Sequence, residues 1–200
     1  MCIRDSASGG GADCFVYEDF QNLNPGEVPE GWAVKAETGT IAVAERDGEK
    51  CLEMNNLTNG DMNITKVFSG QTGIVVLEAE YLFDKVQDYH YLMTVNGGVI
   101  GMETSSGGVG MRMIDLSYTN VIPAVEAGRW YHIKIVMDTQ TKKYAVYVDN
   151  APTPVCGNLM FKGAAESISQ ISLGAVYTGG AKYYVDNIKG YTVSQFPATV

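Results

Sequence analysis

The chain has 200 residues, enough for one β-sandwich domain with a proper hydrophobic core. It carries 14 Lys and Arg against 23 Asp and Glu, a net charge of -9. That excess of acidic residues argues against binding along a nucleic-acid backbone. It also disfavours anionic polysaccharides and acidic lipid surfaces, unless the surface carries a local basic patch. No apolar run approaches the roughly 20 residues of a membrane span. We therefore expect no nucleic-acid partner and no transmembrane segment.

The two ends of the chain differ from its middle. Residues 1–6 (MCIRDS) lack the apolar segment of a signal peptide and resemble the translation of a transposon end used in preparing sequencing libraries. We interpret residues 1–13 as an artefact or a disordered lead-in, with any signal peptide or upstream domain missing. Residues 14–195 are expected to form a single domain, and residues 196–200 a tail.

The cysteines leave the disulfide state open. With Cys2 set aside, Cys14, Cys51 and Cys156 allow either one disulfide and one thiol or three thiols. No CxxC spacing or paired ligands indicate a zinc site.

Segments of alternating apolar and polar residues, separated by turn sequences, follow one another along the chain. Only residues 163–167 suggest a helical turn. This pattern predicts an all-β, two-sheet antiparallel β-sandwich, a jelly roll. In chain order the expected strands are 14–20, 32–34, 39–45, 50–55, 64–68, 74–83, 89–95, 99–103, 109–116, 130–137, 144–149, 168–176 and 183–193.

The clearest local signal is a hairpin over residues 128–150. Its first strand alternates an apolar set that includes Tyr131 and Ile135 with a second set that includes Trp130 and His132. A polar turn over 138–143 joins it to the second strand. One apolar face on each strand requires a second layer to cover it.

Several short motifs, in a fixed order, carry a resemblance that covers about residues 14–195. Together they resemble the concanavalin A-like (laminin-G-like) jelly-roll domains of secreted bacterial proteins, which include carbohydrate-binding modules. The resemblance implies an antiparallel sandwich and an accessory role beside a catalytic domain, and it fixes no ligand. The motifs are YEDF at 17–20, PEGW at 29–32, GEKCL at 48–52, GRWYHI at 128–133, YVDN at 147–150 and YVDNI at 184–188.

The resemblance also implies a structural calcium ion that joins the first and last strands. Glu18, Asp19 and Asp186 match the ligand positions, and carbonyls around residues 49–50 could complete the shell. Gln21 stands where this family often has a Glu. The alternative is that these carboxylates are solvated or cap the chain. Calcium would serve stability rather than chemistry.

A sugar-binding face is the second candidate site, because sugars are held by aromatic platforms flanked by hydrogen-bonding side chains. Trp130 stands where laminin-G-like domains usually have a packed Trp, which favours a core or rim role for it, and the others could belong to an ordinary solvated sheet face. The candidate residues are Glu80, His90, Arg112, Trp130, His132 and Tyr147.

Catalytic carboxylates are the third candidate. Residues 45–49 (ERDGE) fit the E-x-D-x-E spacing of laminarinase-type glucanases, but a hairpin turn at Asp47-Gly48 makes this a false match. Glu78 and Glu80 would share one face of a strand. The only plausible catalytic set is Glu78, Glu80, His90, Arg112 and His132.

Three functions therefore remain. The leading hypothesis is a non-catalytic carbohydrate-binding or adhesion module of a secreted or cell-surface bacterial protein, part of a larger multidomain chain with a glycan as its partner. The alternatives are a glycan-active hydrolase or lyase of the same fold and a structural spacer domain without a ligand.

Overall fold

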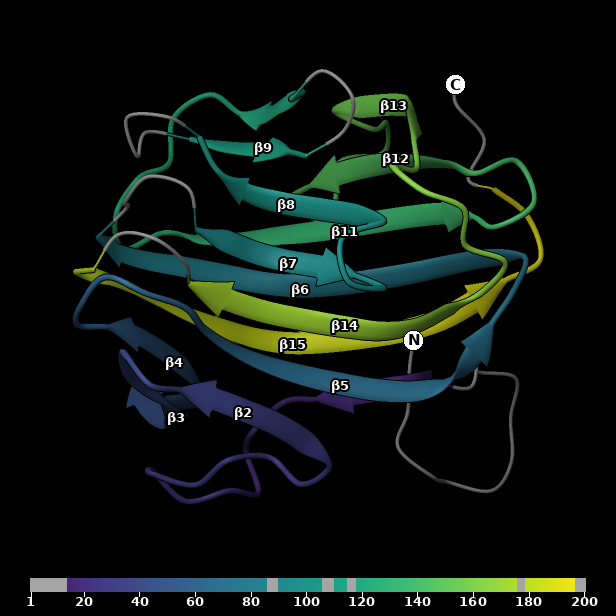
Figure 1. The fold of residues 1–200 in the computed structure, drawn as a ribbon. Helices are drawn as coiled ribbons and strands as arrows, with labels where there is room; N and C mark the ends of the chain where they lie inside the picture. Colours follow the sequence, from purple (N-terminus) through teal and green to yellow (C-terminus); the bar gives the residue numbers. More distant parts are fainter. Residues whose placement is uncertain (1–13, 86–89, 106–109, 115–117, 176–178, 197–200) are drawn as a thin grey trace.

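The computed structural model describes residues 14–85, 90–105, 110–114, 118–175 and 179–196. These residues form two antiparallel sheets that pack face to face, with no helix among them (Figure 1). The predicted all-β, two-sheet sandwich is confirmed. The lead-in predicted over 1–13 and the tail beyond residue 196 lie outside the described residues.

The eight-stranded sheet contains both the first and the last strand of the chain. Its order is β13 (Cys156–Met160), β12 (Lys143–Val148), β11 (Trp130–Asp138), β6 (Ile74–Lys85), β15 (Ala181–Val193), β4 (Glu49–Asn56) and β3 (Gly39–Arg46), with β1 (Cys14–Glu18) also paired to β15.

The seven-stranded sheet lies in front of it in Figure 1. Its order is β10 (Asn120–Ile122), β9 (Met111–Met113), β8 (Ile100–Thr104), β7 (Tyr91–Val95), β14 (Ile168–Ala175), β5 (Met62–Gln71) and β2 (Trp32–Ala36).

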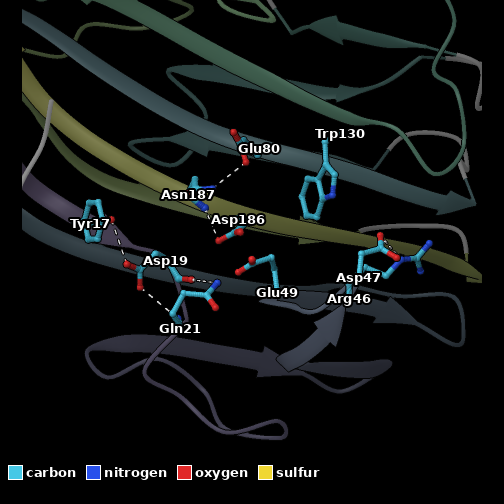
Figure 2. Close-up of a pocket in the computed structure, with 10 residues that line it drawn as sticks. All are labelled: Tyr17, Asp19, Gln21, Arg46, Asp47, Glu49, Glu80, Trp130, Asp186 and Asn187. Carbon is cyan, nitrogen blue, oxygen red and sulfur yellow. Dashed lines mark hydrogen bonds and ion pairs between the residues drawn. The ribbon is translucent and has the colours of Figure 1, made fainter.

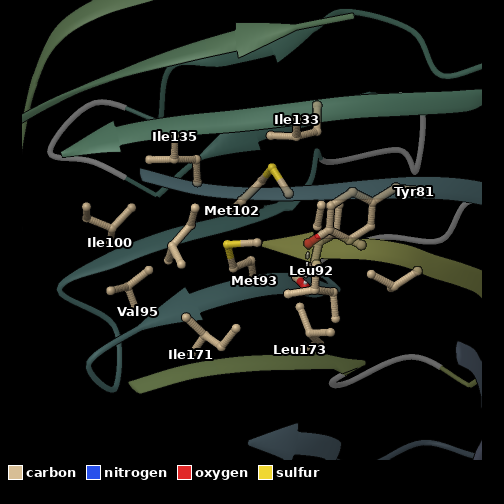
Figure 3. Close-up of a cluster of buried hydrophobic side chains, with 14 of the residues drawn as sticks. Tyr81, Leu92, Met93, Val95, Ile100, Met102, Ile133, Ile135, Ile171 and Leu173 are labelled. Atoms are coloured by element: carbon tan, nitrogen blue, oxygen red, sulfur yellow. Dashed lines mark hydrogen bonds between the residues drawn. The ribbon is translucent and has the colours of Figure 1, made fainter. Parts of the chain in front are cut away.

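The core fills the space between the two sheets, because alternate residues of each strand point inward. In β6, Tyr81 is fully buried, and its hydroxyl donates to the Leu92 carbonyl of the other sheet at 3.4 Å. Figure 3 shows this contact among apolar side chains from both sheets, which include Met93, Val95, Ile100, Met102, Ile133, Ile135, Ile171 and Leu173.

The predicted hairpins form as expected. In β11 and β12, Ile135 pairs with Val146 and both are buried in the core. The turn at Asp47 and Gly48 takes positive φ angles of 55° and 86°, the left-handed conformation that a two-residue hairpin needs. Glu45 and Glu49 therefore do not alternate along one strand, which confirms that the E-x-D-x-E match is false.

β15 changes partners halfway along its length, and this positions the candidate site. Its first part, Ala181–Val185, pairs with β4, and its second part pairs with β1 from Ile188 onward. Between them the register against β6 shifts at a bulge, and Asn187 takes a φ of 50°. A bulge leaves backbone groups unpaired and changes the direction of side chains. Both effects are expected in the region where β1, β4 and β15 meet.

Three local expectations need correction or completion. The suggested helical turn at 163–167 is absent, and the short strands β10 and β13 were not predicted.

Cys51 and Cys156 both carry thiols, so neither is joined to Cys14, which is itself disulfide-bonded. Within the described ranges, no helix has the length and hydropathy needed to cross a membrane.

Candidate functional site

A cavity of about 360 Å³ opens on the outer face of the eight-stranded sheet, where β1, β4 and β15 meet (Figure 2). It lies beside the bulge in β15 and reaches across β6 to the start of β11. We call it the Trp130 pocket. Its walls are Tyr17, Asp19, Gln21, Arg46, Asp47, Glu49, Glu80, Trp130, Asp186 and Asn187.

Trp130 forms the aromatic wall. It is half-buried at the first position of β11, opposite Leu82 of β6, and packs on an apolar cluster with Cys51 and Tyr184. This cluster lies on the outer face of the sheet, away from the main core. Burial raises the pKa of the Cys51 thiol to about 12, so this thiol stays protonated and acts as packing. Trp130 is therefore a fixed indole with part of its surface facing the cavity.

Hydrogen-bonding groups stand opposite the indole. The Asn187 side-chain amide donates to Glu80 Oε2 at 2.9 Å, and its backbone amide donates to Asp186 Oδ1 at 2.7 Å. Both carboxylates project outward from paired positions on β6 and β15. The bulge thus holds two carboxylates and one amide in a fixed arrangement next to an aromatic ring.

The Asp186 carboxyl is strongly perturbed by its surroundings, and only 8% of the residue is exposed. Burial raises its pKa to about 7, against the lowering effect of the Asn187 amide, and the nearby carboxylates of Glu80, Asp19 and Glu49 raise it further. Figure 2 shows the Glu49 and Asp186 side chains turned toward the same space. An ionised Asp186 would gain from a cation or a hydrogen-bond donor in this space.

Arg46 contributes little positive charge to the cavity. Its guanidinium lies 2.8 Å from Asp84 Oδ1 and 3.5 Å from Asp47 Oδ2, and it also donates to the Tyr184 hydroxyl. With this cation already paired, the remaining charged groups of the pocket are carboxylates. The pocket is therefore acidic.

Gln21 ties the end of β1 to the start of β4. Its side-chain amide donates to the carbonyls of Asp19 and Lys50, both at 2.9 Å, and the Lys50 ammonium donates to the Gln21 carbonyl at 3.0 Å. Tyr17 donates to Asp19 Oδ2 at 3.2 Å. Two backbone carbonyls that could ligate a cation thus accept hydrogen bonds from an amide.

The predicted calcium ligands divide between two places. Asp19 and Asp186 both line the Trp130 pocket. Glu18 instead points toward the other sheet, where it accepts a hydrogen bond from Trp32 Nε1 at 3.1 Å and lies 3.8 Å from Lys66 Nζ. Across the described residues, no three His, Cys, Asp or Glu side chains are grouped so as to hold a metal ion.

Two predicted sugar-binding residues lie farther along the same outer face. His132 sits opposite Glu80 on β11, but its Nε2 lies 3.2 Å from Glu78 Oε2. Tyr147 is only 2% exposed, because it packs in an apolar cluster that Phe196 helps to cover. Neither residue lines the pocket, and Tyr147 was expected to face solvent.

The other two predicted residues lie elsewhere. His90 is 1% exposed and therefore belongs to the interior rather than to a surface. Arg112 projects from the outer face of the seven-stranded sheet, where it pairs with Glu103 at 2.6 Å. The suggested catalytic set is therefore split, since Glu78, Glu80 and His132 lie on the opposite outer face, and these residues do not converge in a cleft.

Several pocket residues were not proposed from the sequence as sugar-contacting groups. Tyr17, Arg46 and Asn187 are brought to the cavity by the meeting of three strands that are far apart in the sequence. The repeated Tyr-Val-Asp-Asn motif was the one available signal, because its second copy supplies both Asp186 and Asn187.

Comparisons with known proteins identify the fold. No protein-family model and no curated protein sequence matches the chain. Among solved structures, a sialidase superposes on 92% of the chain with a TM-score of 0.68 at 15% identity, although the chain spans only 19% of that protein. The cellulose-induced protein Cip1 aligns with 89% of the chain and 97% of its own length, with a TM-score of 0.66 at 12% identity.

A third neighbour is domain 4 of AbnA, an extracellular GH43 arabinanase from Geobacillus stearothermophilus, solved in complex with arabinotriose. It covers 93% of this chain and 95% of its own length, with a TM-score of 0.63 at 12% identity. The chain has the concanavalin A-like jelly-roll fold. At these identities the similarity establishes the fold alone.

Proposed function

We propose that this concanavalin A-like domain is a non-catalytic glycan-binding module, and that the Trp130 pocket contacts the glycan. The observation that carries the proposal is the pairing of a fixed indole with the Glu80, Asn187 and Asp186 hydrogen-bonding groups in one cavity. A sugar ring presents an apolar C–H face and a rim of hydroxyls, and this pairing suits both.

The charge of the pocket favours an uncharged glycan. Carboxylates outnumber the single Arg46 guanidinium, which is already paired with Asp84. A uronate or sialate would bring another negative charge next to Glu80 and Asp186, whereas sugar hydroxyls can donate to both carboxylates. We infer that neutral polysaccharides bind and that anionic ones bind weakly.

We infer that the domain does not cleave its glycan, because the candidate catalytic residues are not placed for hydrolysis. Hydrolysis needs two carboxyl groups on opposite sides of a glycosidic bond. Glu78 and Glu80 lie side by side on one strand face, and each is held by neighbours: Tyr191 donates to Glu78 at 2.6 Å and Asn187 donates to Glu80. We propose that these carboxylates orient a ligand rather than cleave it.

Calcium remains part of the proposal as a stabilising ion. The ligand set differs from the predicted one, because Glu18 faces the other sheet and would be replaced by Glu49 beside Asp19 and Asp186. The ion would neutralise the carboxylates between β1, β4 and β15. Side chains would have to draw together, and the amide of Gln21 would have to release the carbonyls that it now bonds. The bound ion would thus offset, at neutral pH, the repulsion between Asp186 and the carboxylates around it.

We also propose that the domain acts outside the cell as an accessory unit of a larger protein. In two of the similar proteins, a sialidase and the arabinanase AbnA, the matching domain is only a part of the protein, and AbnA is described as extracellular. The arabinotriose in the AbnA domain makes arabinan a reasonable first polysaccharide to test.

Affinity electrophoresis through gels that contain arabinan, xylan, mixed-linkage β-glucan or polygalacturonate tests the proposal. We expect retardation by at least one neutral polymer and none by polygalacturonate, with no reducing ends released. Trp130→Ala should abolish the retardation and Trp130→Phe should keep most of it, while Val28→Ala, at an exposed position outside the pocket, should change nothing. Equal retardation of the Trp130→Ala protein would refute the assignment.

A further inference from the structure

We infer that the Trp130 pocket prefers a glycan with free amines, such as a polymer of de-N-acetylated hexosamine, over an uncharged one. The inference rests on the proposed function, because it names the class of glycan that the same pocket takes. The proposed function ranks uncharged glycans above anionic ones, and the same carboxylates rank a protonated amino sugar above both. Such a sugar keeps the ring of an uncharged hexose and carries an ammonium group in place of one hydroxyl.

The walls of the pocket carry more negative than positive charge. Among the described residues that line it, the cation is Arg46, whose guanidinium is already paired with Asp84. Lys182 of the same outer face is also engaged, because its Nζ lies 3.0 Å from Glu53 Oε2. The acidic side chains of the lining are Asp19, Asp47, Glu49, Glu80 and Asp186. A positively charged ligand would supply the balance that these neighbouring cations do not.

Two of these carboxylates stand directly opposite each other. Asp186 of β15 pairs with Glu80 of β6, so their Cβ atoms lie about 5 Å apart, a placement that is destabilising for like charges. The Asn187 amide donates to Glu80, but it is neutral and leaves the repulsion in place. His132 stands on the other side of Glu80, yet its Nε2 lies 3.2 Å from Glu78 Oε2. An ammonium group that contacts both Glu80 and Asp186 would relieve this repulsion.

The spacing of the carboxylates suits an organic cation better than a compact metal ion. A metal such as calcium needs several oxygens within about 2.6 Å of one point. Over the described ranges, no three His, Cys, Asp or Glu side chains are grouped in that way. The carboxylates instead surround a cavity of about 360 Å³, which is large enough for a sugar ring. An ammonium on that ring can form charge-assisted hydrogen bonds with carboxylates on separate walls, without drawing them together.

Trp130 gives the pocket a second means of holding a cation. The face of an indole ring is electron-rich, and Trp is the best of the aromatic residues at binding cations. This ring is half-buried and fixed on the cluster of Cys51 and Tyr184. Figure 2 shows the indole bordering the same space as Glu80 and Asp186. An amino sugar can therefore stack its C–H face on the ring while its ammonium group meets the carboxylates, whereas an N-acetylated sugar has no charge to offer them.

Isothermal titration calorimetry with three pentasaccharides tests the inference. All three have one β-1,4-linked glucose-type backbone and differ at C2, where cellopentaose has a hydroxyl, chitosan pentaose a free amine and chitin pentaose an acetamide. The titrations are made with the full chain at pH 6, where the free amines are largely protonated, and with a chelator to exclude calcium. We expect chitosan pentaose to bind at least about tenfold more tightly than cellopentaose. Added salt should reduce this ratio of affinities, because it screens the charges.

Matched variants separate the pocket from a general attraction between an oligocation and a chain of net charge -9. Glu80→Gln removes one charge and keeps an oxygen for the Asn187 amide, so it should lower the ratio of the two affinities at least about threefold. Glu49→Gln should lower the ratio as well, because Glu49 is turned toward the same space as Asp186. Glu37→Gln makes the same change at an exposed residue outside the pocket and should leave the ratio unaltered. Circular dichroism checks that each variant folds.

The outcomes distinguish a failure of this inference from a failure of the proposed function. Equal affinities for chitosan pentaose and cellopentaose would overturn the inference and leave the glycan-binding pocket standing. A preference for the amine that Glu80→Gln and Glu37→Gln change equally would also overturn it, because the attraction would then be general. Binding of none of the three, with retardation by a neutral polymer in the gels, would overturn the inference alone. Binding of no glycan in either assay would overturn both.

Discussion

The carboxyl group of Asp186 should make the protein less stable at neutral pH than at pH 4. Its pKa is raised from 3.8 to about 7 by burial and by the carboxylates around it. The folded state therefore binds an extra proton between these pH values, and the free energy of unfolding falls as pH rises through this window. A rise of this size corresponds to at most about 4 kcal/mol above pH 7, because one pH unit is worth about 1.4 kcal/mol.

The substitution Asp186→Asn removes this penalty while keeping the oxygen that accepts from the Asn187 amide. Urea unfolding without divalent cations, followed at intervals from pH 4 to pH 8, measures the effect. The two proteins should be equally stable near pH 4. At pH 8 the variant should be more stable by up to about 4 kcal/mol.

Asp47→Asn provides the matched control, because it makes the same charge change at a side chain of the same pocket that is 75% exposed. It should alter stability by less than about 1 kcal/mol at any pH. The reasoning is refuted if Asp186→Asn is less stable than the native protein at pH 8, or if the difference between them does not change with pH.

Three further predictions concern neighbouring residues. Gln21→Glu replaces an amide that donates to two carbonyls with a carboxylate. We expect urea unfolding to show a free energy of unfolding lower by about 1 kcal/mol without calcium, and a recovery when calcium is added. No response to calcium would count against the proposed ion. Tyr147→Phe removes a buried hydroxyl that has no hydrogen-bond partner among the described residues, so stability should stay level or rise by about 1 kcal/mol, and a fall would show a missed partner. Trp130→Ala uncovers Cys51, and labelling by a thiol reagent at pH 8 should quicken, whereas an unchanged rate would mean that Trp130 does not cover this thiol.

Alternation along single strands predicted most of the fold. The 128–150 hairpin formed with the expected inward set, and the turn at Asp47-Gly48 formed where its sequence placed it. The strands β10 and β13 were missed because both are short and lie at sheet edges, where few residues alternate. Edge position depends on the partner strands, which local sequence does not specify.

The site was less predictable because it depends on which sheet and which face each strand joins. Glu18 is the last residue of β1 and faces the other sheet, whereas Asp19, which follows the strand, reaches the pocket. Arg112 alternates as expected but belongs to the other sheet. Tyr147 lies on the outer face of its sheet, as predicted, yet it is buried in an apolar cluster that Phe196 helps to cover. Strand periodicity does not reveal such a contact.

Fluorescence titration with neutral oligosaccharides tests the central claim most directly, because the chain has only two Trp residues and Trp32 is buried. Contact of a sugar with the Trp130 indole should shift or quench the emission of the native protein in a saturable way. The Trp130→Phe protein, which retains Trp32 alone, should bind by calorimetry but show no such change. A saturable change of equal size in both proteins, or glycan binding that leaves native emission unaltered, would contradict the assignment of the Trp130 pocket.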